Sequence, residues 1–204
     1  MIHTLKSLAF VLSIFCFHSI AIAESNPHQF IDSQAQEMVF IIRNNQALYA
    51  KDPELFKEKI NTIFEPMVDF RRVGASVMGK KYYLAASKLQ RLQFIQSFKA
   101  SLLDTYSSTL AQWGDQKIVT IFPEPSELKT TEDVQQNLIT SSNTYPITYK
   151  VRKDKNGNWL IINIIVNGVN LGLTFRNQFQ ALAKEHNDNI DEIIKHWTSD
   201  ANLN

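Results

Sequence analysis

The feature that most constrains the fold is a short apolar run at residues 160–166, which reads LIINIIV. Four of its seven residues are isoleucine, one is valine, and Asn163 is its only polar member. A run this short and this rich in β-branched residues is typical of a strand rather than a helix. A strand that lacks alternating polar residues must be covered on both faces. The remainder of the chain therefore has to supply two covers for this strand.

The segment after the run predicts a helix that supplies part of that cover. Asn167-Gly168 ends the strand, and Leu171, Phe175, Phe179 and Leu182 then recur at helical spacing. This spacing places the four side chains in one apolar stripe. A further helix is predicted around Ile190–Trp197.

The first 23 residues have the features of a cleaved export signal. Lys6 is followed by an apolar run over residues 8–22, and Ala21-Ile22-Ala23 has the small-x-small pattern of a cleavage site. The apolar run is short for a membrane-spanning helix of about 20 residues, so an uncleaved anchor is the weaker alternative. We therefore expect a signal peptide at 1–23 and one α+β domain at 24–204.

The composition of the expected mature chain excludes two classes of protein. Removing residues 1–23 removes Lys6 and Cys16, which leaves 20 basic and 20 acidic residues and no cysteine. A net charge of zero does not favour binding of nucleic acid, and the absence of cysteine rules out a disulfide-stapled fold. The chain must instead be held together by an apolar core.

The N-terminal half has helical periodicity throughout. Start signals and apolar spacing predict helices over 27–46, from residue 53 to near Pro66, over 70–78 with Gly79 at its end, and over 88–113. The longest helix has Phe94, Phe98, Leu102, Tyr106 and Leu110 at four-residue spacing. Ordinary core packing is the commonest explanation of such a stripe.

The period then changes to short β-rich runs. Strands are predicted at 117–122, 133–140, 144–153 and 158–166, and Asn156-Gly157 between the last two is a strong hairpin signal. The predicted fold class is thus α+β, with a helical N-terminal half followed by a four-stranded antiparallel sheet and C-terminal helices.

The sequence shows no pattern of catalytic or metal-binding residues. His28, His186 and His196 are not at ligand spacing from one another, there is no Gly-rich phosphate loop, and no nucleophile motif occurs. We expect no catalytic residue, no metal and no cofactor.

One basic cluster, made of Arg71, Arg72, Lys80 and Lys81, precedes Tyr82-Tyr83. Cations beside amphipathic aromatic residues suit a lipid headgroup or a phosphodiester. A solvated basic surface explains the same residues equally well.

Several motifs in this chain resemble those of the MlaC-type proteins, the periplasmic phospholipid shuttles also called toluene-tolerance proteins. The C-terminal part resembles their signature in Trp159, Val166-x-Gly168-Val169-x-Leu171 and Phe175-Arg176-x-x-Phe179. The segment from Pro66 to Arg72, followed by Met78-Gly79-x-x-Tyr82, is similar to a second family motif. Asn163, Asn167 and Asn170 depart from the Asp, Glu and Ser that the family pattern has there.

The resemblance implies a periplasmic carrier whose helices and sheet enclose a deep apolar pocket for the acyl tails of a glycerophospholipid. It also implies two partners, an inner-membrane ABC transporter complex with its substrate-binding subunit and an outer-membrane lipoprotein–porin complex. No cofactor is implied beyond the bound cargo.

The inward positions of the sheet and of the longest helix are the candidate lipid-binding residues. They are Phe98, Leu102, Tyr106, Tyr149, Val151, Ile162, Ile164 and Val166, with Val169 near the rim. Contact with the headgroup or a partner is assigned to Arg71, Arg72, Lys80 and Lys81. The alternative is an enzyme on a cone-shaped fold of the nuclear-transport-factor-like kind, which needs a carboxylate or histidine inside the pocket.

Overall fold

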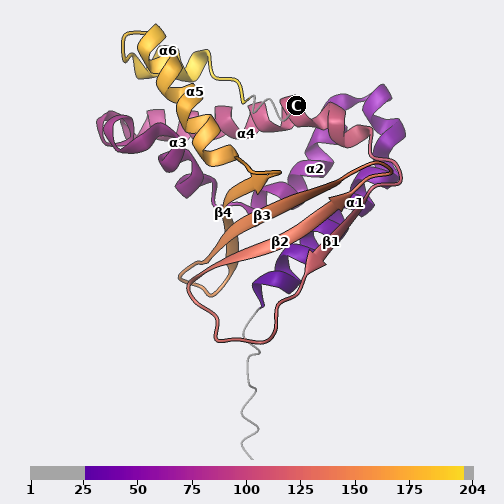
Figure 1. The fold of residues 1–204 in the computed structure, drawn as a ribbon. Coiled ribbons are helices and arrows are strands. Elements are labelled where there is room, and N and C mark those ends of the chain that lie inside the picture. The colour runs from indigo at the N-terminus through magenta and orange to yellow at the C-terminus, as the bar shows by residue number, and fades with distance from the viewer. Residues whose placement is uncertain (1–25, 200–204) are drawn as a thin grey trace, which may run out of the picture.

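The computed structural model describes residues 26–199 (Figure 1). Its N-terminal half is helical, and each helix begins where the sequence signals predict. The expected export signal lies outside the described residues. Asn26 caps the first helix by accepting hydrogen bonds from the N–H groups of His28 and Gln29, and Ser87 with Gln90 forms the predicted capping box. The four helices are α1 (Pro27–Lys51), α2 (Pro53–Met67), α3 (Phe70–Ala85) and α4 (Lys88–Ala111).

Helix α3 is interrupted at Gly79 rather than ended there. Gly79 has φ of 71° and ψ of 164°, a conformation that is essentially restricted to glycine, and helical structure resumes and runs to Ala85. The resumed turn places Tyr82 in the core, where its ring lies 5.3 Å from that of Phe179. Burial of this aromatic ring explains why the helix continues after its break.

The sheet has five antiparallel strands in sequence order, one more than predicted. The additional strand has two residues and arises because Asn167 and Gly168 both adopt positive φ, so the chain turns back on itself instead of entering the next helix directly. The strands are β1 (Lys117–Ile121), β2 (Thr131–Ile139), β3 (Thr144–Lys153), β4 (Trp159–Val166) and β5 (Val169–Asn170).

Strand β4 contains a bulge that changes which of its residues face inward. Lys150 pairs with Asn163 and Val151 pairs with Ile161, which leaves Ile162 without a partner in β3. On the other edge of β4, the extended residue Val68 forms a parallel bridge with Ile161. The segment between α2 and α3 is thereby fixed to the centre of β4.

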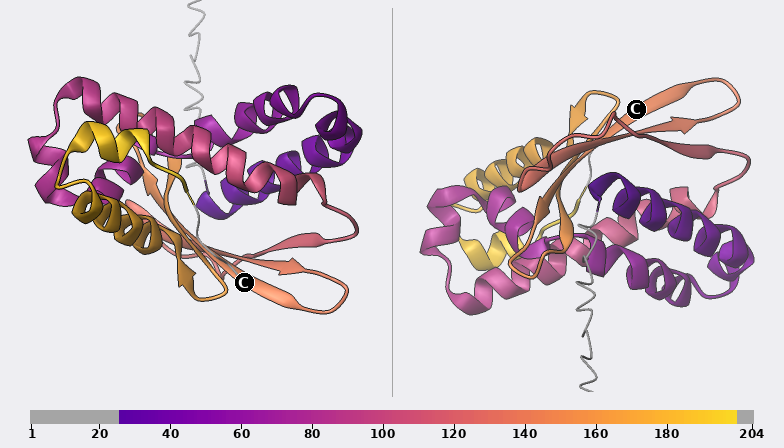
Figure 2. Two further views of the ribbon diagram at one scale, coloured as in Figure 1. Left: turned by 90° about the horizontal axis from the view of Figure 1, so that it is seen from above. Right: turned by 90° about the horizontal axis from the view of Figure 1, so that it is seen from below.

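The last two helices are α5 (Leu171–Glu185) and α6 (Ile190–Lys195). The long helices α1 and α4 lie on one side of the sheet, whose strands curve past them (Figure 2). Within residues 26–199, no helix is both long enough and apolar enough to cross a bilayer.

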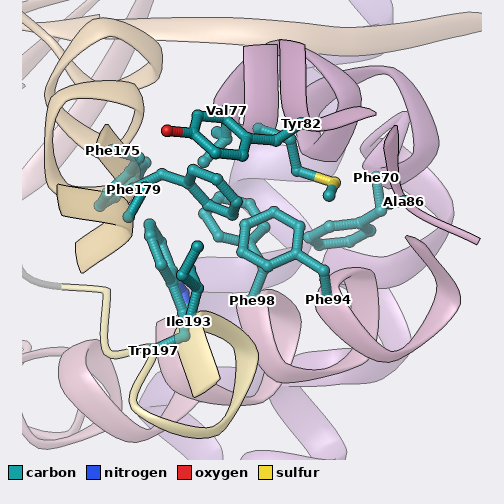
Figure 3. Close-up of a cluster of buried hydrophobic side chains, with 12 residues drawn as sticks. Phe70, Val77, Tyr82, Ala86, Phe94, Phe98, Phe175, Phe179, Ile193 and Trp197 are labelled. Atoms are coloured by element: carbon teal, nitrogen blue, oxygen red, sulfur yellow. The ribbon is translucent and has the colours of Figure 1, made fainter. Parts of the chain in front are cut away.

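An aromatic core joins α3, α4, α5 and α6 (Figure 3). The Phe94 ring packs edge-on against Phe179 and Trp197, each at 5.1 Å between ring centroids. The indole N–H of Trp197 donates to the Ser101 and Ser199 hydroxyl oxygens, both at 3.1 Å. Two smaller cores lie elsewhere, one between α1, α2 and the sheet around Trp159, and one between α1 and α2 around Phe56.

Candidate functional site

Two neighbouring apolar cavities lie between the helices and the sheet. The first has a volume of about 260 Å³ and lies between the α2–α3 segment, α4, β4 and the start of α5. The second has a volume of about 310 Å³ and lies between α1, α2 and the inner face of the sheet. The two cavities share a dividing wall of five side chains: Phe64, Val68, Leu110, Ile161 and Ile164.

The first cavity is lined almost entirely by carbon. Apart from the wall, its apolar lining comes from Phe70, Val73, Phe98, Leu102, Leu103, Leu171 and Phe175. Tyr106 and Asn163 are the two polar side chains in the lining. Lining of this kind suits an aliphatic ligand that is held by burial rather than by specific polar contacts.

The amide group of Asn163 is turned toward the first turn of α5. Its Nδ2 donates to Asn170 Oδ1 at 3.0 Å, and its Oδ1 accepts from the N–H of Gly172 at 3.0 Å. Asn170 Oδ1 also accepts from the N–H of Leu173, as an N-cap does. Asn163 therefore has its hydrogen bonds satisfied by the start of α5 and acts as a positioning residue for this side of the cavity.

The second cavity is lined by α1, α2 and the inward side chains of the sheet, with Gln34, Trp113 and Tyr149 as its polar members. Burial raises the pKa of the Tyr149 phenol well above its usual value, so the group remains a neutral hydroxyl. Tyr149 is half-buried and belongs to the lining of this cavity.

The structure brings together five of the nine sequence-predicted lining residues. Phe98, Leu102 and Tyr106 line the first cavity, Tyr149 lines the second, and Ile164 belongs to the wall between them. The other four lie outside both linings: Val151, Ile162, Val166 and Val169. Lipid contact by any of the nine stays a prediction.

The bulge in β4 explains the position of Ile162. Strict alternation through Ile164 would turn Ile162 inward, but the unpaired residue reverses the alternation and places Ile161 on the wall instead. Val151, opposite Ile161, is fully buried in solid core against Trp159.

The sequence did not lead us to predict the cavity-lining residues of α1, of α2 and of the segment between α2 and α3. Ile31, Met38 and Ile42 on α1 line the second cavity, and the apolar spacing of that helix is the signal that identifies them. Val68 carried no such signal, because its inward position depends on the bridge to Ile161.

The predicted basic cluster divides into two pairs on the surface of α3. Arg71 and Arg72 are exposed and lie in sequence between Phe70 and Val73, two residues of the first cavity lining. Arg72 also forms an ion pair with Asp69, with 3.3 Å between Nε and Oδ2.

Lys80 and Lys81 lie past the Gly79 break. Lys81 contacts Asp188 with 2.5 Å between Nζ and Oδ2, and the Tyr82 hydroxyl donates to the same carboxylate at 2.6 Å. Their hydrogen bonds to Asp188 lower the pKa of that carboxyl, with Lys81 the larger cause. Lys81 is thus engaged with the turn between α5 and α6.

The linings of the two cavities contain no Asp, Glu or His residue among those that the structure describes. The enzyme alternative required such a group inside the pocket. Nothing in the geometry favours that alternative.

Comparison with known proteins decides the family. The model of the MlaC family, described as MlaC protein, matches residues 32–199. The chain belongs to the MlaC family. Its α+β fold and its family are therefore both as the sequence motifs predicted.

Two relatives support the MlaC assignment over nearly full length. Toluene tolerance protein Ttg2D of Pseudomonas putida is 29% identical over 186 residues, which cover 90% of this chain and 85% of the relative. The intermembrane phospholipid transport system binding protein MlaC of Haemophilus influenzae is 28% identical over 191 residues, which cover 92% and 87%.

A solved structure of a phospholipid-binding protein from Ralstonia solanacearum, in complex with a phospholipid, has the same fold. The TM-score is 0.76 at 19% sequence identity, and the match covers 84% of this chain and 94% of the other. At this identity the likeness concerns the fold.

Proposed function

We propose that this MlaC-family protein is a periplasmic carrier of glycerophospholipids, with the acyl chains in the two cavities and the headgroup outside. The observation that carries the proposal is the pair of adjoining apolar cavities that share five lining residues. The names of the Haemophilus influenzae relative and of the Ralstonia solanacearum protein support the choice of ligand.

The energetics of burial suit a carrier. Each buried CH₂ group gains about 0.8 kcal/mol relative to water, so two long acyl chains gain upwards of about 20 kcal/mol. Relative to a bilayer the gain is near zero, because the chains are in an apolar medium in both places. A lining that adds few polar contacts keeps that balance, so the cargo can be released again.

Arg71 and Arg72 are the favoured headgroup contacts of the four predicted cations. They lie in sequence between two residues of the first cavity lining, whereas Lys81 binds Asp188 in the turn between α5 and α6. The guanidinium group can form two parallel hydrogen bonds with a phosphate. We extend the proposal to the two partners that the family resemblance implies, the inner-membrane ABC transporter complex and the outer-membrane lipoprotein–porin complex.

The test is to isolate the exported protein without detergent, extract it with organic solvent and identify the lipid by mass spectrometry. We expect glycerophospholipid in stoichiometric amounts. A delipidated sample should take up lipid again from vesicles of phosphatidylethanolamine and phosphatidylglycerol. Protein that contains no phospholipid and takes none from the vesicles would contradict the proposal.

A further inference from the structure

A cluster of three side chains lies at the far ends of α5 and α6, away from both cavity linings. His186 is the residue at the C-terminal cap of α5, His196 has the same position on α6, and Glu192 is one turn before His196. The two helices lie beside each other at the C-terminal end of the described chain (Figure 1). A tight turn with positive φ at Asn187 and Asp188 connects them.

The turn brings the two histidines together although they are ten residues apart in sequence. Their rings stack with 4.5 Å between centroids and 15° between planes. One side-chain ligand atom from each of His186, Glu192 and His196 lies within 4.8 Å of those from the other two. Glu192 and His196 share a face of α6 because they are four residues apart.

The chemistry of this group matches a transition metal. Two imidazoles and one carboxylate are a common ligand set for Zn²⁺, with bonds of about 2.0–2.2 Å and an open fourth position for water. These bond lengths require ligand atoms roughly 3.3 Å apart, so the cluster has to contract by more than about 1 Å. The exposed His196 side chain can make this movement by rotating out of the ring stack.

A backbone hydrogen bond determines the tautomer of His196 in this structure. Its Nδ1 lies 2.9 Å from the backbone oxygen of Glu192, and a carbonyl oxygen can only accept, so Nδ1 carries the proton. That tautomer leaves the lone pair on Nε2, whereas the atom that faces the Glu192 carboxylate, at 3.6 Å, is Nδ1, so coordination through Nε2 requires the His196 ring to turn. Metal-binding histidines commonly donate their other N–H to a carbonyl in this way.

We propose that His186, Glu192 and His196 form a site for one divalent transition-metal ion, with Zn²⁺ the metal that best fits the ligand set. The proposal replaces our sequence-based expectation of no metal, which rested on spacing alone. It does not depend on the lipid-carrier function, because none of the three residues lines either cavity.

A bound ion would fasten the end of α5 to the end of α6. The next residue after His196 is Trp197, which packs on Phe94 and Phe98 and donates to Ser101 of α4. Metal binding is therefore expected to hold the C-terminal segment against the aromatic core and to raise the resistance of that segment to unfolding.

The experiment uses untagged protein that has been stripped of metal with EDTA and dialysed. The protein is titrated with ZnCl₂ in an isothermal calorimeter, and its melting temperature is measured with and without zinc. We expect one Zn²⁺ per chain and a higher melting temperature when zinc is present. At a free zinc concentration of 100 times Kd, the unfolding equilibrium constant should fall by about 100-fold. His196→Ala and Glu192→Gln should each weaken zinc binding by at least about tenfold.

Lys195→Gln is the matched control, because this exposed neighbour contacts Glu192 but offers no ligand atom, and it should keep zinc binding. Circular dichroism establishes that each variant is folded. His196→Gln, a second substitution of this exposed ligand, should weaken zinc binding as His196→Ala does. The proposal is overturned if the parent chain takes up no zinc, or if His196→Ala and Glu192→Gln bind zinc as tightly as the parent.

Discussion

At the scale of single residues, Asn163 shows why one polar residue occurs in an apolar strand. It lines the first cavity, but its amide completes the start of α5 by donating to Asn170 and accepting from Gly172. Only a side chain with both a donor and an acceptor can make the two contacts. An aspartate in its place would accept from Gly172 but could not donate to Asn170.

Replacing Asn163 by leucine is therefore expected to destabilise the fold by about 1–3 kcal/mol, because a part-buried N–H group of α5 loses its partner. Asn163→Asp should fall between leucine and the parent chain, since a carboxylate still accepts at a helix N-terminus. Urea unfolding followed by circular dichroism measures the difference. A leucine variant as stable as the parent would refute the role assigned to Asn163.

Gly79 provides a second test at this scale. Its φ of 71° and ψ of 164° are strained for any side chain, and a Cβ atom would lie 3.3 Å from the Arg176 guanidinium. Gly79→Ala should therefore destabilise the protein by about 1–3 kcal/mol. In the same unfolding assay Gly114→Ala should change stability by less than about 0.5 kcal/mol, because its Cβ atom would meet only ordinary contacts.

At the scale of elements, helix α4 has two different environments along one apolar stripe. Phe94 and Phe98 are fully buried in the aromatic core, whereas Leu102, Tyr106 and Leu110 face the first cavity, which Phe98 also touches. The four-residue spacing predicted the stripe. It could not predict where core ends and cavity begins, because a void and a solid core require the same apolar side chains.

Strand β4 marks another limit of sequence reasoning. Its length, its apolar character and the hairpin before it follow from local residue types and were predicted. The bulge at Ile162 depends on pairing with β3, so alternation counted from Ile164 assigned the wrong side to this residue. Contacts between distant segments, such as the bridge from Val68 to Ile161, left no pattern in the sequence.

Filling the first cavity tests the function of α4 directly. Leu102→Trp should occupy much of the 260 Å³ and reduce co-purified phospholipid severalfold, at a cost in stability of about 1–3 kcal/mol from overpacking. Ile164→Trp, on the dividing wall, should have the same effect. Leu92→Trp is the matched control on the exposed face of α4, with 59% of the residue accessible, and should leave the lipid content unchanged.

If both cavity variants retain a full complement of lipid, the acyl chains are not in these cavities. Lipid phosphorus per mole of folded protein is the quantity to compare. Circular dichroism of each variant excludes loss of lipid through misfolding.

The turn between β3 and β4 predicts a pH dependence. The Asp154 carboxylate accepts from the N–H groups of Asn156 and Asn158, both at 2.8 Å, and these bonds, with Asn158 the largest cause, lower the pKa of Asp154. A lowered pKa contributes stability that is complete above the unfolded-state value of about 3.9 and is lost as pH falls through the folded-state value.

Asp154→Asn should keep both hydrogen bonds without titrating. Between roughly pH 5 and pH 2, the urea midpoint of the parent should therefore fall by more than that of the variant. Above pH 5 the two midpoints should change in parallel. Equal loss in both proteins at low pH would assign the acid sensitivity to other carboxylates.

At the scale of the whole molecule, three apolar cores adjoin the two cavities. They are the aromatic core of α3–α6, the core around Trp159 and the core around Phe56. Each buries the apolar side chains of the elements around it. Val68 packs against the first two of these, and it also belongs to the wall between the cavities. The cores thus stabilise the fold around two apolar cavities.

The closure of the aromatic core depends on the C-terminal segment. Trp197 is 5% exposed and its indole contacts Phe94, Phe98 and Phe179. Trp197→Ala should destabilise the protein by about 3–5 kcal/mol, as removal of a buried aromatic ring does. Trp197→Phe retains a smaller ring and loses the hydrogen bonds to two serines and part of the packing, so thermal unfolding should show a smaller loss of about 1–3 kcal/mol.

The wall between the cavities also determines how quickly the interior can change its shape. Val68 and Ile161 are joined by a backbone bridge, but the side chains of all five members can rotate on far shorter timescales than those on which helices or strands shift. Rotation of these side chains can therefore change the shape of each cavity without breaking a backbone hydrogen bond. In the carrier that we propose, acyl chains of unequal length would be accommodated at the rate of rotamer exchange, while the helices and the sheet around them stay in place.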